Sequence, residues 1–183
     1  MRQKKGFLRK ISVVLVIMAM LIIMFNVSNS FNHLVSSVTQ LARLIPIYKV
    51  DSSQQAISIS FDASWGAEKT REILDILDKY NVKTTFFLVN IWLEDYPDMA
   101  REIVSRGHEL GLHSVTHPHF TQISQKKMES ELTENFVKIK EITGYEARLF
   151  RAPFGDYNNT VISTASSLGY ICVQWSVEPL HWI

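Results

Sequence analysis

Cysteine is almost absent from this sequence of 183 residues, in which Cys172 is the single example. No disulfide can form within the chain, and a zinc site built from cysteine thiolates is excluded. Because Cys172 lies in the apolar run YICVQW, we expect a buried, unreactive thiol there. Clusters of basic residues are also lacking beyond the first ten positions, and the formal net charge is +1. Nucleic acid is therefore not an expected partner.

Acidic residues are missing from the beginning of the chain, where none precedes Asp51. Residues 1–10 are basic, and residues 11–25 (ISVVLVIMAMLIIMF) are uncharged and almost wholly apolar. A bilayer core requires about 20 apolar residues, with roughly 17 as the lower limit. We interpret residues 11–27 as a single-pass transmembrane signal anchor, preceded by a cytoplasmic stub at residues 1–10.

A cleaved signal peptide is the alternative for this segment, since its apolar part is about 7–15 residues long. The sequence MFNVSNSF that follows shows no clear small-x-small cleavage site, which favours the anchor. Basic residues before such a segment stay in the cytoplasm. We therefore expect a protein of the cell membrane whose remaining chain lies outside the cytoplasm.

Residues 28–55 have mixed polarity and few turn signals, and we expect a linker or stalk there. Residues 56–183 follow a different pattern, in which strand-like and helix-like segments alternate. This alternation predicts an α/β domain with parallel strands and crossover helices. The expected strands are residues 56–61, 82–89, 108–113, 147–153 and 170–177, and the expected helices are residues 68–80, 96–107, 125–144 and 158–169.

Polar residues stand directly after several of these predicted strands. In α/β folds, functional groups gather at the carboxyl ends of parallel strands. The residues in question are Asp62, His113, His117, Arg151 and Glu178. Their positions predict a site at this edge of the sheet.

The segment HSVTHPH supplies two histidines four positions apart, His113 and His117. Imidazoles at this spacing on a turn can bind zinc or a similar divalent ion, although histidine pairs are also found as ordinary surface or core residues. The β-branched residues between them, and Pro118, disfavour a long helix. We expect His119, which follows the proline, to lie outside the ligand set.

Asp62 also allows two interpretations. It can cap the helix that follows, or it can act as a general base beside a metal ion. Arg151 can pair with such a carboxylate and keep it ionised. Tryptophans near a polar site, here Trp175 and Trp182, are common in sugar-binding proteins, but core packing is the commoner role for any one of them.

Together, the segments SFDASWG, HSVTH, RAPFG and WSVEPLHW resemble the four motifs of the polysaccharide deacetylases, the NodB-homology proteins of carbohydrate esterase family 4. The resemblance covers the chain from Ala56 to its end. It implies a distorted (β/α) barrel and the removal of acetyl groups from N-acetylglucosamine or N-acetylmuramic acid units of peptidoglycan or chitin-like polymers. The anchor and the FDASWG variant look most like membrane-anchored members of spore-forming bacteria.

The resemblance also implies roles for individual residues. His113 and His117 would be ligands of a divalent metal, usually zinc, and Asp62 the base that activates water. Arg151 would orient Asp62, and Glu178 stands where the family has an aspartate that tethers this arginine. The residues expected to line the glycan groove are Pro153, Phe154, Gly155, Trp175 and Trp182.

The chain departs from the family pattern at two places. Ala63 stands where most members have a second aspartate, the third protein ligand of the metal. Members usually carry a Leu-x-His motif beyond the fourth motif, and no such motif is present before Ile183, so we expect a barrel that is incomplete at its C-terminal end.

Two hypotheses about function follow: a metal-dependent deacetylase of the cell wall or spore cortex, or a catalytically silent relative that binds glycan or acts structurally in sporulation. A third alternative is an unrelated globular protein whose histidines occur by chance.

Overall fold

The computed structural model describes residues 17–28 and 43–177. The chain divides into two compact units, residues 1–43 and 44–183. In the first unit residues 17–28 are helical. Within the described ranges, no helix combines the length and the apolarity that crossing a membrane requires. Part of the expected anchor at residues 11–27 lies outside these ranges, and the anchor stays a prediction.

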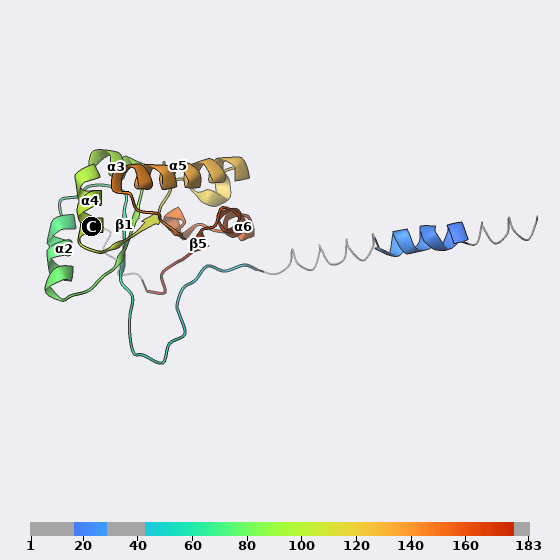
Figure 1. Ribbon diagram of the computed structural model, residues 1–183, viewed down its shortest axis with the longest axis horizontal. Helices are drawn as coiled ribbons and strands as arrows, with labels where there is room; N and C mark the ends of the chain where they lie inside the picture. The colour runs from blue at the N-terminus through green and yellow to red at the C-terminus, as the bar shows by residue number, and fades with distance from the viewer. Residues whose placement is uncertain (1–16, 29–42, 178–183) are drawn as a thin grey trace, which may run out of the picture. The chain divides into compact units, whose positions relative to one another are not determined.

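The second unit contains one sheet of five parallel strands in sequence order (Figure 1). The parallel α/β arrangement predicted from the sequence is therefore confirmed. The sheet is open, and the expected distorted barrel is not formed by the described residues. The strands are β1 (Ser60–Ala63), β2 (Thr85–Leu88), β3 (Glu109–Leu112), β4 (Leu149–Phe150) and β5 (Ile171–Cys172).

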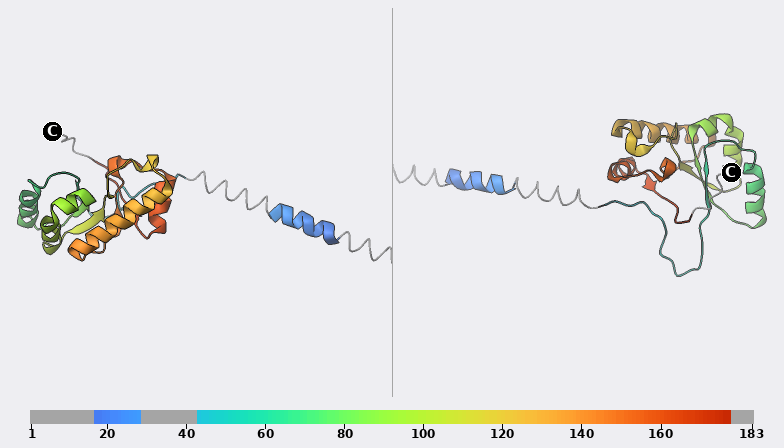
Figure 2. Two further views of the ribbon diagram at one scale, coloured as in Figure 1. Left: turned by 90° about the horizontal axis from the view of Figure 1, so that it is seen from above. Right: turned by 180° about the vertical axis from the view of Figure 1, so that it is seen from behind.

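The helices follow the strands and pack against one another in the order α2, α4, α5 and α6. A right-handed crossover between successive parallel strands places each helix on the same side of the sheet. Figure 2 shows this unit from above and from behind, with α5 as its longest helix. The helices are α2 (Thr70–Lys79), α3 (Asn90–Asp95), α4 (Pro97–Ser105), α5 (Gln125–Thr143) and α6 (Asn159–Ser167). Only α3, which is too short to show a helical period, has no counterpart among the predicted helices.

Several segment boundaries differ from those expected, and β4 and β5 are much shorter than the strands predicted at residues 147–153 and 170–177. The first strand begins at Ser60 rather than Ala56, because its partner strand begins at Thr85, opposite Ser60; Ile57, before it, is 90% exposed. Part of the expected linker packs on the domain, since the backbone N–H of Ile47 donates to the carbonyl of Cys172 at 2.9 Å. Residues 44–47 therefore belong to the folded unit.

The two faces of the sheet differ in chemistry. Successive side chains of a strand point to opposite faces, and one set belongs to the main core cluster with the helices: Phe86, Leu88, Leu110, Leu112 and Phe150. The strand register places Asp62, Phe87 and Gly111 side by side in the other set. Asp62 therefore lies on the face that the core cluster does not cover.

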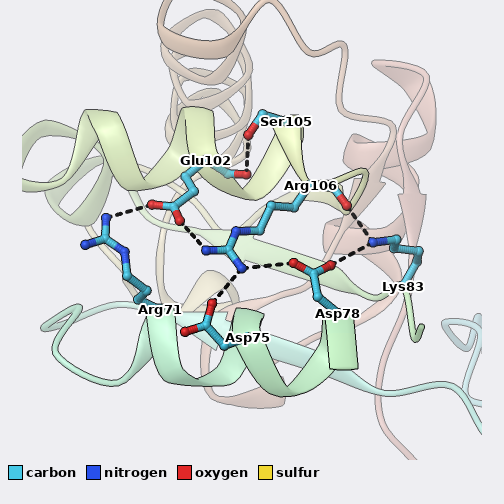
Figure 3. A network of polar contacts seen from close by, with 7 residues as sticks. All are labelled: Arg71, Asp75, Asp78, Lys83, Glu102, Ser105 and Arg106. Atoms are coloured by element: carbon cyan, nitrogen blue, oxygen red, sulfur yellow. Dashed lines mark hydrogen bonds and ion pairs between the residues drawn. The ribbon is translucent and has the colours of Figure 1, made fainter. Parts of the chain in front are cut away.

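Ion pairs connect α2 with α4 at the surface (Figure 3). Arg106 donates hydrogen bonds to Asp75 at 2.8 Å and to Asp78 at 2.9 Å, and it also pairs with Glu102. Lys83 donates to the carbonyl of Arg106 at 2.7 Å. Most of these side chains are well exposed, so salt screens the network and its effect on stability is modest.

His108 is a buried histidine at the amino end of β3, with 3% of its surface exposed. Its Nδ1 accepts a hydrogen bond from the backbone N–H of Thr84 at 3.3 Å, which places the proton of the neutral ring on Nε2. Nε2 is buried and has no hydrogen-bond partner within the part of the chain that the structure describes. Burial lowers the pKa of His108, and the charge of Lys83 lowers it further.

We predict that His108→Asn makes the unfolding free energy less sensitive to mild acid, because it removes the buried titratable ring. The asparagine Oδ1 can still accept the hydrogen bond from the Thr84 N–H. The pKa of His108 is lower in the folded than in the unfolded chain, so unfolding takes up a proton below about pH 6.5. The contribution of the neutral ring to the unfolding free energy is present in full above that pH. It is lost as the pH falls through the pKa that His108 has in the folded chain. Urea titrations at about pH 7.5 and pH 5 should show a smaller loss of unfolding free energy in the variant. Equal losses in the two proteins would contradict this assignment.

Candidate active site

The centre of the candidate site is an ion pair between Asp62 on β1 and Arg151, which follows β4. Arg151 is 5% exposed, and its Nη1 donates to Asp62 Oδ1 at 2.6 Å. Its Nη2 donates to Ser60 Oγ at 2.7 Å. The guanidinium carbon lies 4.0 Å from the ring centroid of Phe87 and 5.5 Å from that of Trp175. These contacts hold one oxygen of Asp62 in a defined position.

Gly111 on β3 makes room for this arrangement. A Cβ atom at this position would come within 2.3 Å of Phe87 Cδ1, a distance that real side chains do not reach. The absence of a side chain at Gly111 therefore lets the Phe87 ring lie against the sheet, where it supports the guanidinium of Arg151.

The two predicted metal ligands meet beside this ion pair. His113 is 2% exposed, and its Nδ1–H donates to the carbonyl of Arg151 at 2.9 Å, which leaves the lone pair on Nε2. Nε2 of His117 lies 3.3 Å from Nε2 of His113. Asp62 Oδ2 lies 3.8 Å from the same His113 nitrogen. The structure thus brings Asp62 beside two histidines that lie far from it in the sequence.

Both histidines are neutral at physiological pH. Burial lowers the pKa of His113, against the opposing charge of Asp62. Burial and the neighbouring His113 lower the pKa of His117 to about 4. A neutral imidazole with an unprotonated nitrogen is the form that binds metal ions.

The spacing of the two Nε2 atoms fits one zinc ion. Nitrogens bound at 2.0–2.1 Å in tetrahedral geometry are separated by about 3.3 Å, the separation found here. The hydrogen bond from His113 Nδ1 to a carbonyl is also typical of histidine ligands, because it fixes the tautomer and the ring orientation.

The described residues supply no third protein ligand to this arrangement. In residues 17–28 and 43–177, no group of three His, Cys, Asp or Glu side chains is placed to hold a metal ion. Ala63, where the resemblance implies an aspartate, is partly buried and packs against the hydrophobic core. The structure therefore supports two imidazole ligands, and Ala63 cannot supply a third.

Aromatic rings surround His117. The ring of Phe154 lies 4.5 Å from that of His117 and stacks on His119 at 4.2 Å. Phe154 is 56% exposed and has a φ of 60°, a backbone conformation that is strained for a bulky residue and is often found at functional sites. The ring of Trp65, which the sequence analysis did not single out, lies 5.3 Å from that of His117 and is 72% exposed.

The remaining predicted groove residues lie in the same region or outside the described residues. Pro153 is buried at the start of a short 3-10 helix. A Cβ added at Gly155 would meet the Trp175 ring at 3.3 Å. Glu178 and Trp182 lie outside the described residues. Arg151, which we expect Glu178 to tether, has a buried Nε with no hydrogen-bond partner among the described residues.

Comparisons with known proteins agree with the motifs. A family model described as polysaccharide deacetylase matches residues 49–173. A peptidoglycan-N-acetylglucosamine deacetylase of Bacillus cereus is 31% identical over 137 residues, which cover 74% of this chain and 64% of that protein. The chain spans about half the length of several other curated relatives that it matches.

Solved structures of the same family share this fold. A family 4 carbohydrate esterase from Bacillus anthracis superposes with a TM-score of 0.72 at 32% identity, covering 75% of this chain and 67% of that one. A family 4 pseudoenzyme from Bacillus anthracis superposes with a TM-score of 0.70 at 30% identity, covering 73% and 47%. Given the matching family model, the motifs and the shared fold, this chain belongs to the polysaccharide deacetylases of carbohydrate esterase family 4.

Proposed function

We propose that this chain is a metal-dependent hydrolase that removes N-acetyl groups from cell-wall polysaccharide of the peptidoglycan type. The observation that carries the proposal is the meeting of two neutral imidazoles, 3.3 Å apart, with a carboxylate oxygen 3.8 Å away. Relatives named as deacetylases of peptidoglycan N-acetylglucosamine and of peptidoglycan N-acetylmuramic acid support the substrate class.

In this proposal, Asp62 is the general base. Its Oδ1 is held by Arg151, and its Oδ2 faces the histidines, where it can take a proton from water as the water oxygen attacks the acetyl carbonyl. The amide C–N bond then breaks as the proton that Asp62 took from water passes to the leaving nitrogen, which gives acetate and a free sugar amine. A divalent ion, when held by His113 and His117, would polarise the carbonyl and stabilise the negative charge that develops on its oxygen.

Arg151 would keep Asp62 oriented during this step, because its Nη1 donates to Asp62 Oδ1 at 2.6 Å. The buried Nε of Arg151 supports the proposal that Glu178 tethers the arginine. Phe154 and Trp175 would contact the sugar rings, with Pro153 and Gly155 shaping the loop and Trp182 completing the aromatic set.

We also propose that the enzyme is held at the cell membrane with its domain outside the cytoplasm, and that it acts in sporulation. The apolar, uncharged run at residues 11–25, preceded by basic residues, supports the anchor. The resemblance of the FDASWG segment to sporulation-type members supports the role in sporulation.

A second candidate function is glycan binding without hydrolysis. Two observations favour it: Ala63 offers no ligand, and one of the similar structures is a pseudoenzyme. A variant of that pseudoenzyme is described as having restored enzymatic activity. In our proposal, the two candidates differ in whether the metal is held firmly enough for catalysis.

Catalysis is tested by measuring acetate release from N-acetylglucosamine oligomers and muropeptides in the presence of zinc. Asp62→Asn should reduce the rate by about 10²–10⁴-fold, because it removes the base. Asp98→Asn, at an exposed position of α4, is the matched control and should keep the wild-type rate. Glycan binding without acetate release in the wild-type chain would replace the first candidate with the second.

Metal binding is tested by equilibrium dialysis of the full chain against micromolar zinc. We expect one bound ion, with His113→Ala weakening the affinity by more than about 100-fold because it removes a direct ligand. His108→Asn changes a histidine at the opposite end of β3 and should leave the affinity unaltered. Failure of the wild-type chain to bind zinc would exclude the metal-dependent mechanism.

A further inference from the structure

Helix α5 carries two polar residues, Glu131 and Asn135, on its buried side. Both are 0% exposed, although they stand among the core residues Met128, Leu132 and Ile139. Burying a carboxylate and an amide in such surroundings is unfavourable unless their polar atoms have partners. Those partners come largely from the loop that carries the two candidate metal ligands.

Glu131 binds the middle of this loop. Its Oε2 accepts hydrogen bonds from the backbone N–H groups of Val115 at 2.8 Å and Thr116 at 2.9 Å. Its Oε1 accepts from Thr116 Oγ1 at 2.9 Å and pairs with Lys127 at 3.0 Å. Burial raises the pKa of Glu131, but the hydrogen bonds from Thr116 and Lys127 outweigh burial and leave the pKa lowered. The carboxylate therefore stays ionised and fully engaged.

Asn135 binds the beginning of the loop. Its Oδ1 accepts from the backbone N–H groups of His113 at 2.9 Å and Ser114 at 3.2 Å. Its Nδ2 donates to the Leu88 carbonyl at 3.0 Å and to Asn90 Oδ1 at 2.7 Å. An asparagine amide can donate two hydrogen bonds and accept two, and here it makes all four. Asn135 thus joins the end of β2 to the residue that carries the first imidazole.

The loop has a conformation that needs such support. Ser114 and His117 have φ values of 81° and 55°, which are uncommon for residues other than glycine. Strained residues of this kind persist where the surrounding structure fixes them. Within the loop, the N–H of His117 donates to Ser114 Oγ at 2.9 Å, and the bonds to Glu131 and Asn135 fix the remainder from outside.

We propose that Glu131 and Asn135 are positioning residues that keep the Nε2 atoms of His113 and His117 at the separation required by one divalent ion. They contact neither the ion nor the substrate in this role, and act through the backbone of residues 113–116. The inference rests on the proposed function, because the ion is the one proposed there.

The first test measures zinc affinity by competition with a chelator, using the full chain at a temperature where every variant is folded. Glu131→Gln and Asn135→Leu should weaken zinc binding by about 10–100-fold, as expected for residues that orient metal ligands. Asn135→Asp keeps an oxygen toward His113 and Ser114 and should lose less affinity than Asn135→Leu. The visible spectrum of bound Co²⁺ should change with the affinity.

Ile139→Ala is the matched control. The change truncates a fully buried side chain of the same helix, and the side chain of Ile139 makes none of the hydrogen bonds to the loop. It should lower the unfolding free energy while leaving the zinc affinity and the Co²⁺ spectrum unchanged.

Zinc affinities of Glu131→Gln and Asn135→Leu within roughly twofold of the wild-type value would overturn the proposal, because loss of a residue that positions metal ligands should weaken the affinity by about 10–100-fold.

The second test needs no metal and separates this inference from the proposed function. Hydrogen exchange of the Val115 and Thr116 amides should be at least about tenfold faster in Glu131→Gln, because local opening is no longer opposed by the carboxylate. Exchange of the Leu110 amide in β3 should be unchanged. If the wild-type chain binds no zinc, the proposed function fails. Unchanged exchange at Val115 and Thr116 in Glu131→Gln would overturn the positioning role, whether or not the wild-type chain binds zinc.

Discussion

The guanidinium of Arg151 is the constraint on which the candidate site depends. It donates to Ser60 and Asp62 on β1 and lies over the Phe87 ring from β2. The backbone of the same residue accepts from His113 Nδ1 and donates to the Leu112 carbonyl at 3.0 Å. A buried cation is costly unless an anion accompanies it. The pairing with Asp62 therefore fixes the base, and the carbonyl of Arg151 fixes the first imidazole beside it.

Much of the fold and part of the site could be predicted from the sequence. The alternation of strand and helix patterns predicted the parallel sheet, and the polar residues after the strands predicted that Asp62, His113 and Arg151 would meet. The roles of Gly111 and Phe87 could not be predicted, because they depend on side-chain volume across neighbouring strands. Glu131 and Asn135 did leave a signal, since they interrupt the apolar stripe of α5 that includes Met128, Leu132 and Ile139.

Ala63 separates the two candidate functions. Ala63 follows Asp62 at the end of β1 and packs against the core cluster, and its side chain has no atom that can bind a metal ion. The chain keeps the carboxylate, the arginine and both imidazoles that the family motifs imply. Ala63 supplies no ligand, and in our proposal this makes metal affinity, rather than the position of the base, the property that decides between hydrolysis and glycan binding.

A double-mutant cycle tests the central claim that Asp62 and Arg151 form one coupled unit. The unfolding free energy is measured for the wild-type chain, for Asp62→Asn, for Arg151→Gln and for the double variant. We predict a coupling energy of about 1–3 kcal/mol, because each single change leaves the partner without its charge-assisted hydrogen bond. Effects that add to within about 0.5 kcal/mol would contradict the account, because independent residues behave in that way.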